Sequence, residues 1–395
     1  MTTVGIVGGG QLARMMHAAS IGLGLRVSLL AEGPDVSAAQ VVRDVVVGDY
    51  TDAATLLAFA QGVDVVTFDH EHVPTPILES LVASGIPVRP GPTALVHAQD
   101  KAVMRERLAS HGAYAPRHRV VATPADLAAF GDEVGWPVIA KTSRGGYDGK
   151  GVWKVDDHDG CHEPFEALTR AQGPTERQAA GPDATQPVVQ ILAEEYVPFV
   201  RELSAIVARS PHGQAVAYPI SESVQVAGIC VETTTPAPGL TEAQAVECQR
   251  LALEIAAELD VTGILAVELM EHPDGRIVVN ELAMRPHNTG HWTIDGAHTS
   301  QFENHLRAVC DMPLGLPTTR AAWTVMRNVL GGARTDLVAG LDEVLARDPS
   351  LKVQLYGKSV VPGRKVGHVT AYGDDLDDVR RRARDGAEYL RGGDA

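Results

Sequence analysis

Short apolar runs alternate with amphipathic segments through the first hundred residues of the chain. The pattern predicts strands over residues 4–7, 26–30, 45–47 and 63–68, and helices over residues 11–23, 52–60 and 75–84. Such alternation of short strands and helices is typical of parallel β-α-β units. A segment rich in Pro and Gly at residues 85–95 then marks a domain boundary.

The pattern changes after this boundary. One helix is predicted to start behind Thr123, because Thr is a favoured N-cap and Pro124 suits the first helical position. Residues 135–155 are predicted to form a strand, a glycine loop and a second strand, and residues 157–187 a loose polar insertion around one helix. The further predicted elements are strands from residue 188 onward and helices over residues 100–110 and 241–259.

Composition limits the possible partners. Lys and Arg number 34 against 50 for Asp and Glu, a net charge of −16, so nucleic acid and anionic membranes should be repelled. An anionic ligand must therefore be held by a local basic cluster or by backbone N–H groups. The four cysteines lack C-x-x-C spacing, which fits a reducing compartment. The sequence shows neither a signal peptide nor a membrane-spanning run, so we expect a cytoplasmic protein with no membrane partner.

The first chemical motif is the run GIVGGGQLARM near the N-terminus. Gly8, Gly10 and Ala13 satisfy a loose G-x-G-x-x-G/A pattern, which read alone indicates a dinucleotide. Glu32, at the end of the second predicted strand, could then imitate the acid that binds a ribose. A helix N-terminus behind a glycine turn binds phosphate whatever molecule carries it, however, so hydride transfer is one of two interpretations.

The second motif is RGGYDGKG, residues 144–151, with four glycines between two apolar runs. Its backbone N–H groups could approach phosphate oxygens closely, and Lys141 adds a cation just before the loop. The loop departs from a Walker A sequence, because Lys150 is followed by Gly151 rather than Ser or Thr. The alternative is an ordinary flexible turn.

A third motif surrounds the Pro-Asp-Gly turn in GILAVELMEHPDGRIVVNELAMRPHNTGHW. If Asp274 and Gly275 form a two-residue turn, Glu268 lies opposite Glu281, on the same face as Val279. Two opposed carboxylates repel, and a divalent cation between them would remove that penalty. Asn288 could supply another oxygen. The alternative is a longer loop, with one glutamate facing solvent.

Two further clusters carry charge. The acidic bend with Glu194, Glu195 and Glu202 would suit a purine and a ribose, although a solvated bend is the simpler interpretation. Near the C-terminus the basic residues Lys358, Arg364 and Lys365 suggest an anion site in this acidic chain, or an ordinary solvated turn. The run MRPHNTGHW adds Arg285, His287, His291 and Trp292, for which substrate contacts are favoured over zinc ligation.

Taken together, these residues resemble the ATP-grasp ligases. The shared features are Lys101 in a helix, Lys141 in a strand, a glycine lid, an acidic hinge and paired strand glutamates. More narrowly, the motifs GGGQLARM, RGGYDGKG, NELAMRPHNTGHW with SQFENHLRA, and PGRKVGH resemble the N5-carboxyaminoimidazole ribonucleotide synthase family of purine biosynthesis. The resemblance runs in order over nearly the whole chain, and the four motifs together are very specific.

The resemblance implies a fold and a reaction. The fold is α/β and α+β: a Rossmann-like pre-ATP-grasp lobe over residues 1–97, an ATP-grasp domain over residues 98–310 with a lid at about 118–192, and a β-rich C-terminal extension over residues 311–395. The reaction is that of a carbon–nitrogen ligase. Bicarbonate, ATP and 5-aminoimidazole ribonucleotide (AIR) form N5-carboxyaminoimidazole ribonucleotide, ADP and phosphate through carboxyphosphate, with two Mg²⁺ ions, in a homodimer.

It also implies residue roles. The catalytic residues would be Arg285 nearest the carboxyphosphate, Asp148 at the amine or imidazole, and Lys141. Glu268, Glu281 and Asn288 would hold Mg²⁺. ATP would contact Lys101, Lys141, Gly146, Tyr147, Asp148, Gly149, Lys150, Gly151, Val152, Glu194, Glu195, Tyr196, Val197, Glu202, Gln225, Asn280 and Glu281. The ribonucleotide would contact Gly10, Gln11, Leu12, Glu71, Tyr147, Asp148, Arg285, His287, Asn288, Lys358, Arg364 and Lys365.

The chain departs from the family pattern in places. The run FDHEHVP carries Asp69, His70 and His72 where relatives often have a Glu-Phe-Glu-Asn-like run, and Gln225 replaces a histidine. These departures affect ligand contacts rather than the reaction. The alternatives are a sister enzyme, such as a formate-dependent glycinamide ribonucleotide transformylase or a biotin-type carboxylase, and a non-catalytic ATP-binding protein. An NAD oxidoreductase is more distant.

Overall fold

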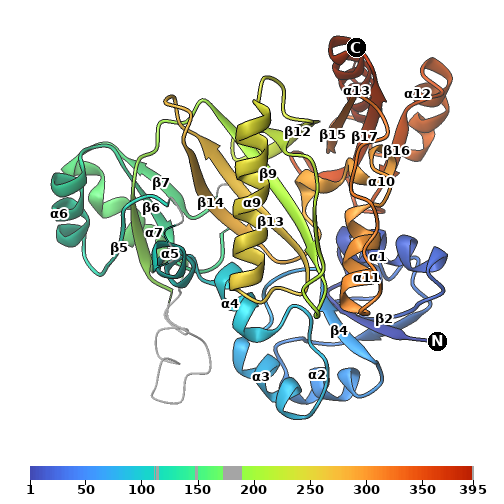
Figure 1. The fold of residues 1–395 in the computed structure, drawn as a ribbon, viewed down its shortest axis with the longest axis horizontal. Coiled ribbons are helices and arrows are strands. Elements are labelled where there is room, and N and C mark those ends of the chain that lie inside the picture. Colours follow the sequence, from blue (N-terminus) through green and yellow to red (C-terminus); the bar gives the residue numbers. More distant parts are fainter. Residues whose placement is uncertain (111, 113–114, 147–149, 172–188, 394–395) are drawn as a thin grey trace.

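The computed structural model describes residues 1–110, 112, 115–146, 150–171 and 189–393 of the chain. Within these residues the chain forms three sheets (Figure 1). The lid sheet lies at one side of the molecule, and the N-terminal sheet and the C-terminal strands lie at the other, with β9, β13 and α9 between them. Among the described helices, none has both the length and the apolar character needed to cross a membrane.

The N-terminal sheet is parallel, with strand order β3-β2-β1-β4. Its elements are β1 (Thr3–Val7), α1 (Gln11–Gly22), β2 (Arg26–Ala31), β3 (Asp44–Val47), α2 (Ala53–Ala60), β4 (Val65–Phe68), α3 (Thr75–Ala83) and α4 (Pro92–Gln99). The predicted β-α-β pattern is confirmed, with each boundary within two residues. Because all the strands run parallel, the loops after β1 and β4 leave the same edge of the sheet.

The lid sheet is antiparallel, with strand order β5-β8-β6-β7. The predicted N-cap is confirmed, since Thr123 and Asp126 form a capping box and Pro124 is the first residue of α6. The lid has an apolar cluster of its own, which includes Leu127 and Phe130. The elements from α5 to β8 are α5 (Lys101–Ser110), β5 (His118–Val121), α6 (Pro124–Val134), β6 (Val138–Thr142), β7 (Val152–Val155), η1 (His158–His162), α7 (Glu163–Ala171) and β8 (Ile191–Glu195).

The central sheet has nine strands, all in antiparallel pairs, in the order β14-β13-β9-β11-β12-β15-β17-β16, with β10 beside β9. Its strands are β9 (Arg201–Arg209), β10 (Ala215–Ala217), β11 (Ser221–Val226), β12 (Ile229–Thr235), β13 (Gly263–Glu271), β14 (Ile277–Ala283), β15 (Trp323–Leu330), β16 (Lys352–Leu355) and β17 (Lys365–Gly373). The C-terminal strands therefore extend the central sheet, because β15 pairs with β12.

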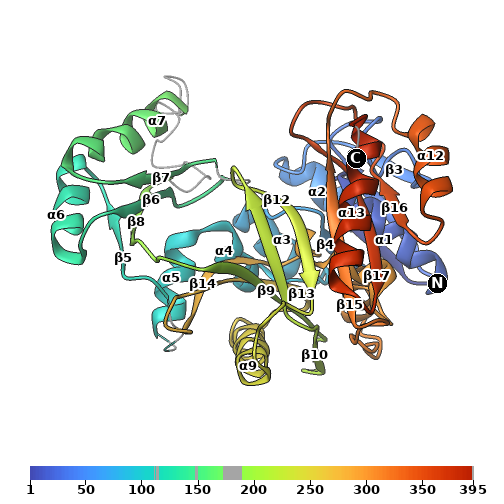
Figure 2. The ribbon, with the colours of Figure 1, turned by 90° about the horizontal axis from the view of Figure 1, so that it is seen from above.

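Helices connect and cover the central sheet. They are α9 (Glu242–Glu258), η2 (Asn288–Gly290), α10 (Thr293–Gly296), α11 (Gln301–Val309), η3 (Val338–Gly340), α12 (Leu341–Arg347) and α13 (Leu376–Arg391). One apolar cluster joins α4, α5, α9 and β13 through Leu95, Met104, Ile255 and Leu265, so the N-terminal lobe and the central sheet share a core. Seen from above, the lid helices α6 and α7 lie far from α12 and α13 (Figure 2).

The hairpin of β13 and β14 brings Glu268 opposite Glu281, as predicted, but by a different route. The turn is longer than two residues, because His272 pairs with Arg276 through a 2.9 Å backbone hydrogen bond. A bulge between Glu268 and Leu269 adds the compensating residue in β14. Val279 consequently pairs with Leu269, so its predicted position on the carboxylate face is wrong.

Candidate active site

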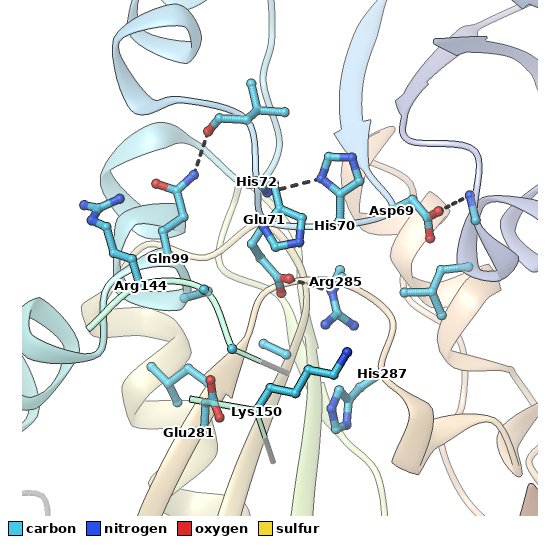
Figure 3. A pocket seen from close by; sticks show the side chains of 18 of the residues that line it. Asp69, His70, Glu71, His72, Gln99, Arg144, Lys150, Glu281, Arg285 and His287 are labelled. Atoms are coloured by element: carbon cyan, nitrogen blue, oxygen red, sulfur yellow. Dashed lines mark hydrogen bonds and ion pairs between the residues drawn. The ribbon is translucent and has the colours of Figure 1, made fainter. Parts of the chain in front are cut away.

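A cavity of about 1390 Å³ opens where the N-terminal lobe, the base of the lid, the central sheet and a C-terminal loop meet (Figure 3). Arg285 and Lys150, which come from different lobes, both point into it. The predicted site residues that line it are Gly10, Gln11, Leu12, Glu71, Lys101, Gly146, Lys150, Glu268, Glu281, Arg285, His287, Asn288, Lys358, Arg364 and Lys365. Four parts of the fold, with residues that are far apart in sequence, thus form one concave surface.

The first glycine loop is held by carboxylates of its own lobe. The backbone N–H of Gly9 donates to Glu32 at 3.0 Å, and that of Gly10 donates to Asp69. A Cβ atom at residue 10 would overlap the Asp69 carboxylate, which explains the glycine. Glu32 therefore binds this loop, instead of being open to a ribose. The first turn of α1, which begins at Gln11, remains at the cavity wall.

The segment after β4 contacts the segment after β14. Nε of Arg285 lies 2.7 Å from Glu71, which also accepts from the backbone N–H of Met284 at 3.2 Å. Burial acts against the charged guanidinium, but the carboxylates of Glu71 and Asp69 outweigh it and raise the pKa of Arg285. The N-terminal lobe thus orients a cation that belongs to the central sheet.

The unusual histidines of this segment pack against one another. The ring of His70 lies 4.5 Å from that of Tyr50 and 5.1 Å from that of His72. Nε2 of His70 lies 3.5 Å from Glu32, and this contact lowers the pKa of Glu32 to about 2. Burial, with the charge of His70, lowers the pKa of His72, which lines the cavity as a neutral imidazole near pH 7.

Both paired glutamates have polar partners at the cavity wall. Nζ of Lys101 lies 2.9 Å from Glu281, and Nε2 of His287 lies 3.2 Å from Glu268. Burial would raise the pKa of Glu268, but the hydrogen bond and charge of His287 lower it. On the neighbouring strand β9, burial and the charge of Glu268 raise the pKa of Glu202 to about 7.

These side chains fit a magnesium ion. Glu268, Glu281 and Asn288 offer two carboxylates and an amide oxygen around one cavity, which is the hard donor set that Mg²⁺ prefers. Among the described residues, no group of three His, Cys, Asp or Glu side chains is placed to hold a metal. A magnesium ion here would consequently take its other ligands from water and phosphate, as Mg²⁺ commonly does.

Glu194 has a different environment from the predicted one. Its carboxylate accepts from Nε of Arg105 at 2.5 Å and lies 2.8 Å from Nζ of Lys141, with a side-chain exposure of only 3%. Burial opposes ionisation, yet the two cations hold the pKa of Glu194 at about 2. This carboxylate therefore positions Lys141, instead of being open to a ribose. Lys141 also donates to Asn280 at 3.3 Å.

Arg105 is a site residue that the sequence reasoning missed. It is fully buried, and its guanidinium also donates to the backbone carbonyls of Val279 at 3.1 Å and Asn280 at 2.6 Å. It thereby supports the β14 bulge beside Glu281. The sequence feature that could have indicated it is the place of Arg105 beside Met104 and Leu108 in the buried stripe of its helix, where an arginine is unusual.

Other predicted residues lie elsewhere. Nε of Arg117 lies 2.7 Å from Glu195, and Tyr196 is exposed. His291 and Trp292 are fully buried in the core, so the predicted substrate contacts for them are wrong. Tyr147, Asp148 and Gly149 lie outside the described residues. The predicted ATP contacts that the structure describes but that do not line the cavity are Lys141, Gly151, Val152, Glu194, Glu195, Tyr196, Val197, Glu202, Gln225 and Asn280.

The basic C-terminal loop docks on the N-terminal lobe. Nζ of Lys358 donates to the side chain of Gln11, and Oγ of Ser37 donates to the carbonyl of Tyr356 at 2.5 Å. Arg364 donates to Ser359 at 2.8 Å and, like Lys365, lines the cavity. The basic cluster and the N-terminus of α1 therefore face one another, an arrangement suited to an anion.

Three family models match consecutive parts of the chain. The ribonucleotide synthetase preATP-grasp domain matches residues 1–99, the ATP-grasp domain residues 106–302, and the phosphoribosylaminoimidazole carboxylase C-terminal domain residues 324–382. These ranges follow the order of the N-terminal sheet, the lid with the first part of the central sheet, and the C-terminal strands.

Two proteins that are named N5-carboxyaminoimidazole ribonucleotide synthase are similar to this chain over nearly its whole length. The N5-carboxyaminoimidazole ribonucleotide synthase of Mycobacterium tuberculosis (strain CDC 1551 / Oshkosh) is 49% identical over 393 residues, 99% of this chain and 88% of that protein. The Corynebacterium ammoniagenes protein of the same name is 46% identical over 396 residues, 99% and 92% of the two chains.

Solved structures agree with this likeness. The N5-carboxyaminoimidazole ribonucleotide synthetase of Thermus thermophilus is 35% identical with a TM-score of 0.83, covering 99% of this chain and 98% of its own. The N5-carboxyaminoimidazole synthase of Aspergillus clavatus, in complex with ADP and 5-aminoimidazole ribonucleotide, is 30% identical with a TM-score of 0.86, covering 98% of each chain.

Proposed function

The chain belongs to the N5-carboxyaminoimidazole ribonucleotide synthase family of ATP-grasp enzymes, and from this premise we propose that it carboxylates AIR with bicarbonate and ATP. The products are N5-carboxyaminoimidazole ribonucleotide, ADP and phosphate. One observation carries the proposal: a single cavity joins a helix N-terminus and basic loop, the half-buried Arg285 and a pair of glutamates. These are suited to a 5′-phosphate, a carboxylate-type intermediate and MgATP, respectively.

The chemistry explains why one enclosed cavity is needed. Bicarbonate is a poor electrophile, and transfer of the γ-phosphoryl group of ATP to it gives carboxyphosphate and ADP. Carboxyphosphate then releases CO₂ and phosphate beside the exocyclic amine of AIR, which attacks the carbon and loses a proton. Water would hydrolyse the intermediate and open solvent would disperse the CO₂, so exclusion of water preserves both.

Within the proposal, the cations act by position and charge. Lys101 and Lys141 hold the phosphates of ATP. A Mg²⁺ ion bound by Glu268 and Glu281 would neutralise the negative charge of these phosphates. Arg285, oriented by Glu71, stabilises the carboxyphosphate. The proposed roles of Tyr147 and Asp148 at the lid belong to residues that the structure does not describe. A homodimer acting in the cytoplasm completes the proposal, on the support of the family resemblance.

The test is release of inorganic phosphate from MgATP and bicarbonate, with and without AIR. We expect strong AIR-dependent release that is lost in Glu281→Ala and retained in Glu247→Ala, whose glutamate is exposed on α9 away from the cavity. Stimulation by formate and glycinamide ribonucleotide instead of AIR would indicate the sister transformylase. Phosphate release that ignores every acceptor would refute the assignment.

A further inference from the structure

Asn328 is a buried polar residue directly behind the wall of the active-site cavity. It lies in β15, between β12 and β17, and is 3% exposed. It does not line the cavity, but its contact Asn288 does. A buried amide needs partners for both its oxygen and its NH₂ group, so the contacts of Asn328 show what it holds in place.

The two asparagines form a reciprocal pair. Nδ2 of Asn328 donates to Oδ1 of Asn288 at 2.7 Å, and Nδ2 of Asn288 donates to Oδ1 of Asn328 at 3.1 Å. Nδ2 of Asn328 also donates to the backbone carbonyl of Cys230 at 2.9 Å. Cys230 follows Ile229, which lines the same cavity. One buried side chain thus connects the C-terminal strand β15 with two parts of the cavity wall.

This arrangement selects one orientation of both amides. A backbone carbonyl only accepts hydrogen bonds, so Cys230 must face the NH₂ group of Asn328 rather than its oxygen. The geometry then directs the Asn328 oxygen toward Nδ2 of Asn288. Turning the Asn288 amide by half a turn would oppose NH₂ to NH₂ and oxygen to oxygen, at the loss of both hydrogen bonds.

We propose that Asn328 is a positioning residue of the carboxylation site, which fixes the Asn288 amide so that its oxygen and its second N–H always reach ligands in the cavity from the same points. The inference rests on the proposed function, because it takes Asn288 as a contact of the metal or of the carboxylate-type intermediate. A fixed amide meets such a ligand without reorganising, whereas a turning amide presents N–H where an oxygen is required.

The test compares Asn328→Leu with a matched control, Asn304→Leu. Asn304 is also a buried asparagine with three hydrogen bonds, to Tyr218 and Gly315, but it does not line the cavity. We expect Asn328→Leu to lower kcat/KM for AIR-dependent phosphate release by about 10- to 100-fold, the range found when a supporting partner of a site ligand is removed. Asn304→Leu should lower thermal stability and leave kcat/KM within about twofold at 25 °C.

A double-mutant cycle separates positioning from general damage. If Asn328 acts through Asn288, Asn328→Leu should cause little further loss in an Asn288→Ala background. Fold losses that multiply fully would overturn the proposal, as would full activity of Asn328→Leu. Should the leucine variant not fold, Asn328→Asp takes its place, because it keeps the shape but turns an oxygen toward the Cys230 carbonyl and should cause a similar loss.

A crystal structure of the Asn328 variant tests the inference without relying on turnover. We expect the Asn288 amide to leave its wild-type position, and an unmoved Asn288 would refute the proposal. The two assignments can fail separately. Wild-type protein that ignores AIR contradicts the proposed function, whereas an active wild type with an unmoved Asn288 or multiplying losses contradicts only the role of Asn328.

Discussion

Replacing Arg105 by methionine removes the fully buried guanidinium that contacts Glu194, Val279 and Asn280. Methionine fills similar space without charge, so the change mainly leaves the Glu194 carboxylate with Lys141 as its cation partner. Removal of one partner of a buried ion pair costs about 3–5 kcal/mol. We therefore expect Arg105→Met to lower the free energy of unfolding by about 3 kcal/mol or more at pH 7.

The pKa of Glu194 supports this magnitude and predicts a pH dependence. It lies at about 2 instead of 4.5, and at 1.36 kcal/mol per pH unit the difference corresponds to about 3 kcal/mol. The folded-state pKa is depressed, so this stability is present above pH 4.5 and is lost as the pH falls toward 2. Without Arg105, burial should raise the pKa of Glu194, so that protonation relieves the variant as the pH falls.

The assay is urea unfolding of wild type and Arg105→Met at pH 7.5 and pH 4.5. The difference in unfolding free energy should be larger at pH 7.5. Arg107→Met is the matched control on the same helix, because the Arg107–Glu258 pair is partly exposed and should contribute less than about 1 kcal/mol. A loss that is equal at both pH values, or no larger than that of the control, would refute the reasoning.

Three further predictions concern Glu71, Glu202 and Gly10, the last with Gly22 as its control. Glu71→Gln removes the carboxylate that orients Arg285. In steady-state kinetics we expect kcat/KM for AIR to fall about 10-fold or more, with the KM for ATP unchanged. Kinetics identical to those of the wild type would count against this role of Glu71. The pKa of Glu202 is raised to about 7, so the wild type without Mg²⁺ and ATP should lose stability as the pH rises from 4.5 through 7. Glu202→Gln lacks this titration, so its melting temperature should exceed that of the wild type by an amount that grows between pH 5 and pH 8. A difference in melting temperature that stays constant over this pH range would disprove the prediction. Gly10→Ala should destabilise by about 1–3 kcal/mol, because its Cβ has no space. Gly22→Ala, with nothing near its Cβ, should stabilise by about 0.5–1 kcal/mol, and urea unfolding that ranks these two variants otherwise contradicts the packing.

The hairpin of β13 and β14 shows how far local pattern reaches. Alternation along the two strands and a turn signal were enough to place Glu268 opposite Glu281. The predicted turn was nevertheless too short by one residue, and a bulge in β14 restores the register. At this bulge the backbone carbonyls of Val279 and Asn280 accept hydrogen bonds from Arg105, which comes from the distant helix α5. The sequence of β14 contains no local pattern that predicts this bulge.

The burial of individual side chains was a second feature that the sequence did not predict. His291 and Trp292 belong to the same motif as His287 and Asn288, which line the cavity, and the sequence offered no reason to treat them differently. In the structure the His291 ring lies 5.6 Å from that of Phe302 in α11 and 5.1 Å from that of His368 in β17. Trp292 is buried in the apolar cluster that β9 and β13 form with Tyr218. Burial lowers the pKa of His291 well below its usual value, so it is neutral.

The sequence by itself determined the features that depend on near neighbours. The strand and helix rhythm, the Thr123 cap, the glycine loops and the ordered motifs all arise within a few residues, because backbone periodicity and capping act at that range. These were sufficient for the family resemblance and the class of reaction. Tertiary structure alone decided that Arg105 and Lys141 enclose Glu194, that Asp69 holds the first glycine loop, and that Asn328 reaches Asn288. Such contacts join residues that are 40 to 89 positions apart, so they depend on sheet order, register and burial, which are properties of the folded chain as a whole.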